Sequence, residues 1–219
     1  AAILEALASV REDGASRRPV QVVFTRGEEL GLVGAKNLDF SLITATEGVV
    51  FDGNGPPSKV TVASPTYIGF DVSVTGRAAH AGAEPEKGIS AIRIAADIIS
   101  KLPQGRLDDE TTFNVGTIQG GSVRNAVPEN ASFSGEFRSR SLESLDMLRM
   151  DVLSAIQEAR SSYPQATITE NLEVSFEAYS LKADNPMVLL VSKVLTALDM
   201  EPELAPSGGG TDGNILSQH

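Results

Sequence analysis

Apolar and polar positions follow two different patterns along this chain. Between residues 65 and 179, apolar and polar residues alternate in several segments, as in strands with one covered face. Before and after that stretch, apolar residues occur in short continuous runs, which are typical of strands buried on both faces of a parallel sheet. Ser64-Pro65 marks the first boundary between the two patterns. The pattern predicts a discontinuous α/β domain, residues 1–64 and 180–219, with a second domain, residues 65–179, inserted into it.

The inserted segment has the order strand, helix, strand, strand, helix, strand. Strict alternation covers residues 68–75, 131–138 and 168–176, and Phe113 begins a further strand. The two helices between them, over about 88–102 and after the N-cap Ser141, carry apolar stripes. The stripes are Ile89, Ile92, Ala96, Ile99 and Leu102 in the first, and Leu145, Leu148, Val152, Ala155 and Ala159 in the second. Four strands under two helices predict a ferredoxin-like βαββαβ sandwich.

The flanking segments predict the elements of a parallel sheet. We expect buried strands at Val20–Thr25 and Gly48–Phe51, and a short strand at Val60–Val62. Helices are expected at the start of the chain, near Gly31–Leu38, and after the cap Asn185. The stripe of that last helix is Met187, Leu190, Val191, Val194 and Leu198.

Acidic residues follow two of the predicted strands. Glu28 and Glu29 come after the first strand, and Asp52 comes directly after the second. In open α/β sheets, ligands bind beyond the carboxyl ends of the strands, so these acids are expected to converge. Adjacent carboxylates repel each other unless a cation or a raised pKa relieves them, so one would bind metal and its neighbour would move protons. A solvated turn at the start of a helix would give the same residues.

Composition excludes several classes of protein. The 219 residues contain no cysteine, which excludes disulfides, thiolate zinc sites and cysteine nucleophiles, and this fits a cytoplasmic protein. A net charge of −11 argues against nucleic acid as a partner. No apolar run is long enough to span a bilayer, so no membrane partner is expected. Both ends of the chain lie inside predicted helices, and we therefore expect a longer parent polypeptide.

A glycine run, Ser207–Gly213, precedes the last predicted helix. Glycines before a helix expose backbone N–H groups, which can cradle an anion such as a carboxylate. A flexible loop would have the same composition.

Five motifs occur in order: FTRGEELGLVGA, VVFDGNGP, VTGRAAHAG, GGSVRNAVPENA with GEFRS, and SGGGTDGN. Together they closely resemble the di-zinc exopeptidase and amidohydrolase family, which includes tripeptidase T, carboxypeptidase G and aminoacylase. The second and last motifs look most like the peptidase T-like branch. The resemblance covers nearly the whole chain. It implies a partial α/β catalytic domain with an inserted ferredoxin-like lid that pairs subunits into a homodimer.

The resemblance also implies chemistry at the acidic residues. Glu28 would be the general base that deprotonates a metal-bound water and later protonates the leaving amine. Glu29 and Asp52 would be ligands of a pair of zinc ions, with cobalt or manganese as alternatives. The reaction implied is hydrolysis of a peptide or N-acyl amino acid amide bond.

Further residues resemble the substrate-binding groups of the family. His80 resembles a histidine that reaches the partner subunit's site and steadies the oxyanion. Asn125 and Arg138 resemble a substrate-binding pair, in which Arg138 takes a carboxylate through its forked donors. Gly209 and Gly210 would hold the substrate backbone or carboxylate.

The match is incomplete. The family's upstream His-x-Asp motif, its bridging Asp and its last His have no counterpart among these residues, where only His80 and His219 occur. We therefore expect the 219-residue segment to be inactive alone, since zinc needs three or four protein ligands. Two alternatives stay open: a non-catalytic dimerising module with a degenerate site, and a carboxylate-binding protein that uses Arg138 and the glycine loop.

Overall fold

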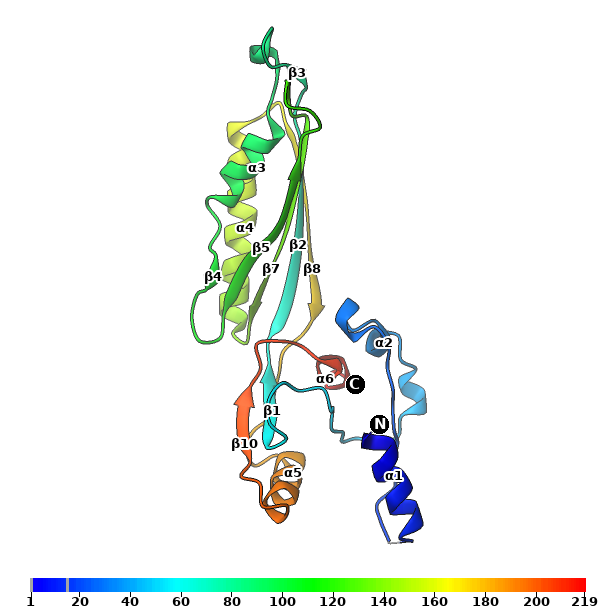
Figure 1. Cartoon of the computed structure of the whole chain (residues 1–219). Coiled ribbons are helices and arrows are strands. Elements are labelled where there is room, and N and C mark those ends of the chain that lie inside the picture. Colours follow the sequence, from blue (N-terminus) through cyan, green and yellow to red (C-terminus); the bar gives the residue numbers. More distant parts are fainter. Residues whose placement is uncertain (1, 15) are drawn as a thin grey trace.

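The computed structural model describes residues 2–14 and 16–219 and has two parts (Figure 1). We call residues 65–179 the lid and the remaining residues the host domain. The host domain holds α1 (Ala2–Glu12), a 3-10 turn (Glu28–Leu30), α2 (Val33–Lys36), a second 3-10 turn (Phe40–Leu42), β1 (Lys59–Ser64), α5 (Pro186–Ala197), β10 (Glu203–Pro206) and α6 (Asp212–Leu216). β9 (Tyr179–Ser180) lies at the end of the lid and pairs with β1.

The lid is a two-layer sandwich. Its elements are β2 (Thr66–Thr75), β3 (Ala79–His80), a 3-10 turn (Pro85–Lys87), α3 (Ala91–Ile99), β4 (Gly105–Arg106), β5 (Thr112–Gly120), β6 (Ala126–Val127), β7 (Asn130–Ser139), α4 (Leu142–Ser162) and β8 (Thr167–Phe176). The main sheet has the order β4-β5-β7-β2-β8 with every pair antiparallel, and α3 and α4 cover one face of it (Figure 1). This is the predicted ferredoxin-like fold.

Aromatic side chains fill the space between the sheet and the two helices. Phe70, Phe113, Phe133 and Phe137 are each at most 1% exposed, and the rings of Phe113 and Phe137 stack 5.7 Å apart. Gly135 makes room for this cluster, because a Cβ there would lie 2.2 Å from the ring of Phe70. Alternation along the strands therefore fixes which face of the lid is apolar and leaves the opposite face for polar side chains.

The predicted stripe is confirmed for α4 and only partly for α3. All five expected residues of α4 are buried. For the first helix, Leu102 is buried and Ile89 and Ile99 pack against the core as expected. However, Ile92 is 40% exposed and Ala96 is also exposed. The buried face of α3 comprises Ala91, Ile94, Ala95 and Ile98, so the expected stripe is rotated away from the buried face.

The stripe predicted for α5 is also wrong. The helix begins as expected, with Asn185 accepting a hydrogen bond from the backbone N–H of Met187. However, its buried residues are Val188 and Leu195, whereas Val194 and Leu198 are at least half exposed. This helix carries apolar residues on all of its faces, so the spacing of its apolar residues does not single out the buried face.

The host domain has a small mixed sheet. β1 pairs in parallel with β10 on one edge and antiparallel with β9 on the other, which confirms the short strand predicted at Val60–Val62. No helix within residues 2–14 and 16–219 is long and apolar enough to cross a membrane.

The two buried strands expected at Val20–Thr25 and Gly48–Phe51 are not formed. Both segments have no regular secondary structure, and Phe24 and Phe51 are 64% and 78% exposed. A buried parallel strand needs a neighbouring strand and helices on both faces. Both edges of β1 are already occupied, and no other strand of the described residues lies beside either segment.

Candidate active site

Glu28 and Glu29 begin a tight turn that glycines make possible. Gly27 and Gly31, at its two ends, have φ angles of 64° and 89°, in the left-handed region that glycine adopts without strain. The backbone N–H of Gly34 donates to the carbonyl of Arg26 at 2.8 Å, which closes the turn onto α2. The turn leaves Glu28 half-buried and Glu29 exposed.

Three other carboxylates act on Glu28. Its pKa is raised above its usual value, first by burial and then by the negative charges of Asp52, Glu29 and Asp212. The structure therefore brings together the acids of the two predicted strand ends, although neither strand is formed. It adds Asp212, which the sequence analysis did not single out.

Asp212 links the glutamate turn to the C-terminal part of the chain. Its Oδ2 accepts a hydrogen bond from the hydroxyl of Thr25, three residues before Glu28. Its Oδ1 is buried and has no hydrogen-bond partner among the residues that the structure describes. An unpaired carboxylate oxygen is costly in a protein interior, so this atom is a ready acceptor for a donor group.

The donors present only partly fit a metal pair. Carboxylate oxygens are suitable ligands for divalent ions, and the unpaired oxygen of Asp212 adds one more. Across residues 2–14 and 16–219, however, no group of three or more His, Cys, Asp or Glu side chains is arranged to hold a metal ion. These residues do not make a complete zinc site, which needs three or four protein ligands.

Arg138 lies on the polar face of the lid sheet, opposite Phe133 and Phe137 as alternation predicts. Its Nε pairs with Glu136 at 2.9 Å, and its guanidinium carbon lies 4.7 Å from the centre of the Tyr67 ring. A further N–H donates to the carbonyl of Gly208 at 3.3 Å. Arg138 therefore joins the lid to the glycine loop.

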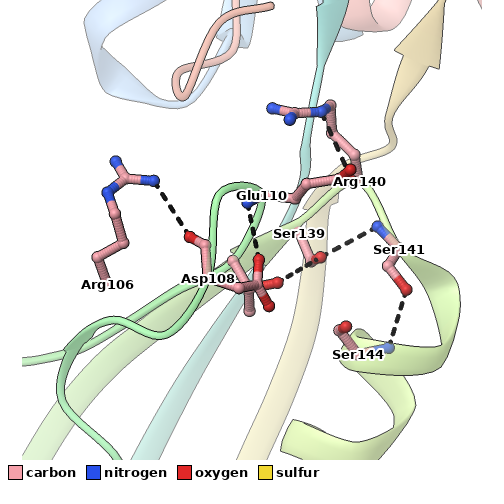
Figure 2. Close-up of polar contacts among 8 residues, drawn as sticks. Arg106, Asp108, Glu110, Ser139, Arg140, Ser141 and Ser144 are labelled. Atoms are coloured by element: carbon pink, nitrogen blue, oxygen red, sulfur yellow. Dashed lines mark hydrogen bonds and ion pairs between the residues drawn. The ribbon is translucent and has the colours of Figure 1, made fainter.

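A cavity of about 230 Å³ opens beside Arg138 where the lid meets the host domain, lined also by Arg106, Glu110, Arg140, Ser207 and Gly208. Figure 2 shows the hairpin that forms one wall of it, in which the backbone N–H of Glu110 donates to Asp108 at 2.7 Å. This hydrogen bond lowers the pKa of Asp108 below its usual value. Arg140 faces Glu110 at 3.8 Å (Figure 2).

The glycine loop uses several of its backbone donors in local hydrogen bonds. The N–H of Gly209 donates to the Ser207 hydroxyl at 3.0 Å, and that of Thr211 donates to Asn214 at 3.0 Å. Gly210 packs under Phe176, where a Cβ would lie 2.3 Å from the ring. Close packing therefore explains a glycine here, and the loop exposes fewer N–H groups than the sequence pattern indicates.

His80 and Asn125 lie together at the far end of the lid, in a tip formed by β3, β6 and their loops (Figure 1). The carbonyl of Asn125 accepts from the N–H of Ala81 at 3.0 Å. Nδ1 of His80 accepts from the N–H groups of Gly82 and Ala83, each at 3.2 Å. The Nε2 edge of this exposed ring takes no part in those bonds.

The structure does not bring His80 and Asn125 to Arg138. The tip adjoins the Asn130 end of β7, whereas Arg138 lies eight residues along the same strand. At about 3.3 Å per residue, the two groups are separated by roughly 25 Å. A single chain therefore has its predicted substrate-binding residues in two separate places.

The sequence pattern does not single out Thr25 and Asp212, which join two distant segments of the host domain, or Asn214, which joins the host domain to the lid. The capping box of α6, between Thr211 and Asn214, is a local signal at one of these positions. The partners of these side chains lie far away in the sequence, and a local pattern contains no information about them.

Comparison with known proteins agrees with this architecture. A family profile described as a peptidase dimerisation domain matches residues 62–164. An uncharacterised protein of Bacillus subtilis, YqjE, is 36% identical over the whole chain, which spans 59% of that relative. Peptidase T of Streptococcus agalactiae is 25% identical over 204 residues, 90% of this chain and 48% of the relative.

Two crystal structures resemble nearly the entire chain. An aminopeptidase PepT from Bacillus cereus is 32% identical with a TM-score of 0.87, and a tripeptidase from Staphylococcus aureus is 30% identical with a TM-score of 0.92. In each case 99% of this chain matches 58% of the other. The chain thus spans about three fifths of the solved structures it resembles.

Proposed function

This chain belongs to the M20 peptidase family, in its peptidase T-like branch, and on that premise we propose that the full-length protein hydrolyses amide bonds near a peptide terminus. The substrate is a small peptide or an N-acyl amino acid. The domain division proposed is residues 1–64 and 180–219 for the catalytic part and 65–179 for the lid. A cytoplasmic location is proposed from the lack of cysteine.

Glu28 is the proposed general base. Its ionised carboxylate takes a proton from the attacking water, and the protonated acid then gives that proton to the leaving amine. The observation that carries this role is the position of Glu28, half-buried in a tight turn and within electrostatic range of Asp52, Glu29 and Asp212. Two of these neighbours are the proposed metal ligands, so the carboxylate of Glu28 would lie close to a water that such ions activate.

Glu29 and Asp52 are proposed as two members of a larger ligand set for a zinc pair, with cobalt or manganese as alternatives. When bound, such ions would polarise the scissile carbonyl and acidify a water. These two carboxylates alone are too few for a zinc site, which needs three or four protein ligands.

Arg138 and the glycine loop are proposed to bind the substrate carboxylate, with Gly209 and Gly210 against its backbone. The hydrogen bond from Arg138 to Gly208 and the adjoining cavity support this arrangement. His80 and Asn125 are proposed to act in the partner's site of a homodimer. Their separation from Arg138 supports that view, because only a second chain can bring such a tip to the loop.

The test compares metal content and aminopeptidase activity of the full-length protein, its Glu28→Gln variant and a control, Glu201→Gln, at an exposed site after α5. Equal zinc in all three is expected, with activity on a tripeptide falling by about 10²–10⁴-fold only in Glu28→Gln. Retained activity in that variant would contradict the role of Glu28. No metal and no activity in the unmodified protein would favour the alternative, a dimerising module with a degenerate site.

A further inference from the structure

Asn214 is the fully buried amide of the host domain, with 0% of its surface exposed. Its Nδ2 donates to the carbonyl of Glu177 at 2.8 Å and faces that of Pro65 at 3.4 Å. Its Oδ1 accepts from the N–H of Thr211 and from the hydroxyl of Ser64, each at 3.0 Å. Every donor and acceptor site of the amide is therefore used.

The two carbonyls on Nδ2 belong to the two crossings between host domain and lid. Pro65 lies between β1 and β2, and Glu177 lies between β8 and β9. The chain passes between the host domain and the lid only at these two crossings. One side chain on α6 therefore binds both covalent connections of the lid.

The acceptor side of Asn214 faces the glycine loop. Oδ1 accepts from the N–H of Thr211, which lies in that loop. The hydroxyl of Ser64, on β1, lies 2.9 Å from the carbonyl oxygen of Gly209 and 3.0 Å from Oδ1 of Asn214. The lid touches the same loop from the other side, through Arg138 and Gly208. A rotation of the lid relative to the host domain would therefore move the glycine loop through the hydrogen bonds of Asn214.

We propose that Asn214 is a positioning residue that fixes the angle of the lid relative to the glycine loop and so aligns Arg138 with Glu28. Its catalytic consequence rests on the proposed function. Asparagine suits this role because its amide offers two donors and an acceptor at one position. Aspartate has the same shape but offers only acceptors, so it repels the carbonyls of Pro65 and Glu177.

The substitution Asn214→Asp is expected to leave the fold intact. The crossings are also joined directly, because the N–H of Ala178 donates to the hydroxyl of Thr66 at 2.8 Å. A matched control is Tyr163→Phe, which removes a hydrogen bond to Asp97 inside the lid, away from the crossings and the cavity. Both variants lose a polar contact, and only Asn214→Asp loses the contact that joins both crossings to the glycine loop.

The experiment measures the distance distribution between spin labels on two exposed positions, Asn171 on β8 and Lys193 on α5, in the full-length protein. These 219 residues contain no cysteine, so the two label sites are introduced without competing thiols from this chain. The distribution is expected to broaden in Asn214→Asp and to match the unmodified protein in Tyr163→Phe. The ratio kcat/KM is expected to fall about a hundredfold in Asn214→Asp alone, the loss that a 1 Å misplacement of a binding group can cause.

Each outcome decides the question. An unchanged distribution in Asn214→Asp overturns the proposal, as does a broadened distribution with full activity. If the unmodified protein has no activity, the proposed function fails and the distance distributions alone test the link between lid and loop. If Asn214→Asp does not fold, Ser64→Ala takes its place, since it removes a single hydroxyl from the same network and should broaden the distribution less.

Discussion

Thr25 and Asp212 are 187 positions apart in the sequence, and the hydroxyl of Thr25 donates a hydrogen bond to Oδ2 of Asp212. This contact holds the segment that leads into Glu28 against the first turn of α6. Because the other oxygen of Asp212 is buried without a partner, Thr25 is its one hydrogen-bond donor among the described side chains.

Thr25→Val should therefore destabilise the host domain. A hydrogen bond to a charged group contributes about 1.5–3 kcal/mol, so the free energy of unfolding in urea should fall by about 2 kcal/mol. Thr169→Val, at an exposed position of β8, serves as the control and should change that free energy by less than about 0.5 kcal/mol. Equal stability of the two variants would mean that the contact with Asp212 contributes little.

The tip of the lid can be tested by mixing inactive variants. If His80 acts in the partner's site, a chain with His80→Ala and a chain with Glu28→Gln complement each other in a mixed dimer. One site of that dimer then has both residues intact, and random pairing of equal amounts gives about one quarter of the unmodified activity. A mixture no more active than its components would instead place His80 in its own chain's site or in none.

Arg138→Lys tests the proposed recognition of carboxylate. Lysine keeps the positive charge but loses the planar fork that pairs with Glu136 and faces Tyr67. The KM of a peptide with a free C-terminal carboxylate should rise at least about tenfold, and the KM of its C-terminal amide should change far less. Arg11→Lys, on exposed α1, is the control. A similar loss for both substrates would show that Arg138 supports the lid rather than binding the carboxylate.

Two glycines of the same loop provide a matched pair. A Cβ on Gly210 would lie 2.3 Å from the ring of Phe176, whereas a Cβ on Gly208 would meet nothing within 4 Å. Gly210→Ala should therefore lower the free energy of unfolding by about 1–3 kcal/mol, the usual cost of overpacking. Thermal or urea unfolding of Gly208→Ala should resemble that of the unmodified protein. The reverse order of stabilities would mean that the loop does not pack on Phe176.

Alkaline pH should weaken the lid through Tyr163. Its hydroxyl donates to Asp97, and this bond, together with burial and the charge of Asp97, raises the pKa of Tyr163 above its ordinary value of 10.0. A raised pKa in the folded state means that the stabilisation is full below pH 10 and is lost as the pH rises through the folded value.

Tyr163→Phe removes that bond and should cost about 1 kcal/mol at pH 7. The difference between the two proteins in urea unfolding should shrink above pH 10, because the unmodified protein then loses the same contact. The subtraction cancels the other tyrosines, which both proteins share. A difference that stays constant with pH would contradict the hydrogen bond to Asp97.

The fold of the lid was predictable because short sequence patterns, such as strand alternation and helix caps, specify most of its elements. Alternation in three of its strands fixes which side chains face the helices, and the cap at Ser141 fixes where α4 begins. The host domain was less predictable, because the run at Val20–Thr25 has the composition of a buried strand but no strand partner among the described residues. An apolar run specifies a preference for burial, and only tertiary contacts decide whether a sheet satisfies it.

The site was predictable only in part for a related reason. Glu28, Glu29 and Asp52 were singled out because they follow apolar runs, and the charges of Glu29 and Asp52 do act on Glu28. Asp212 and Asn214 matter through partners that include Thr25 and Ser64, each more than 100 residues away in the sequence. Asn125 and Arg138 were expected to act as a pair, but they lie near opposite ends of β7.

The pairing of Ser64 with Tyr179 has a consequence for how such proteins diversify. The 114 residues between them leave and re-enter the host domain at neighbouring positions of one antiparallel strand pair, about 5 Å apart. The host domain therefore needs almost no change in its own geometry to accommodate the inserted segment. Evolution could therefore exchange, shorten or delete the intervening module while the rest of the fold stayed unchanged.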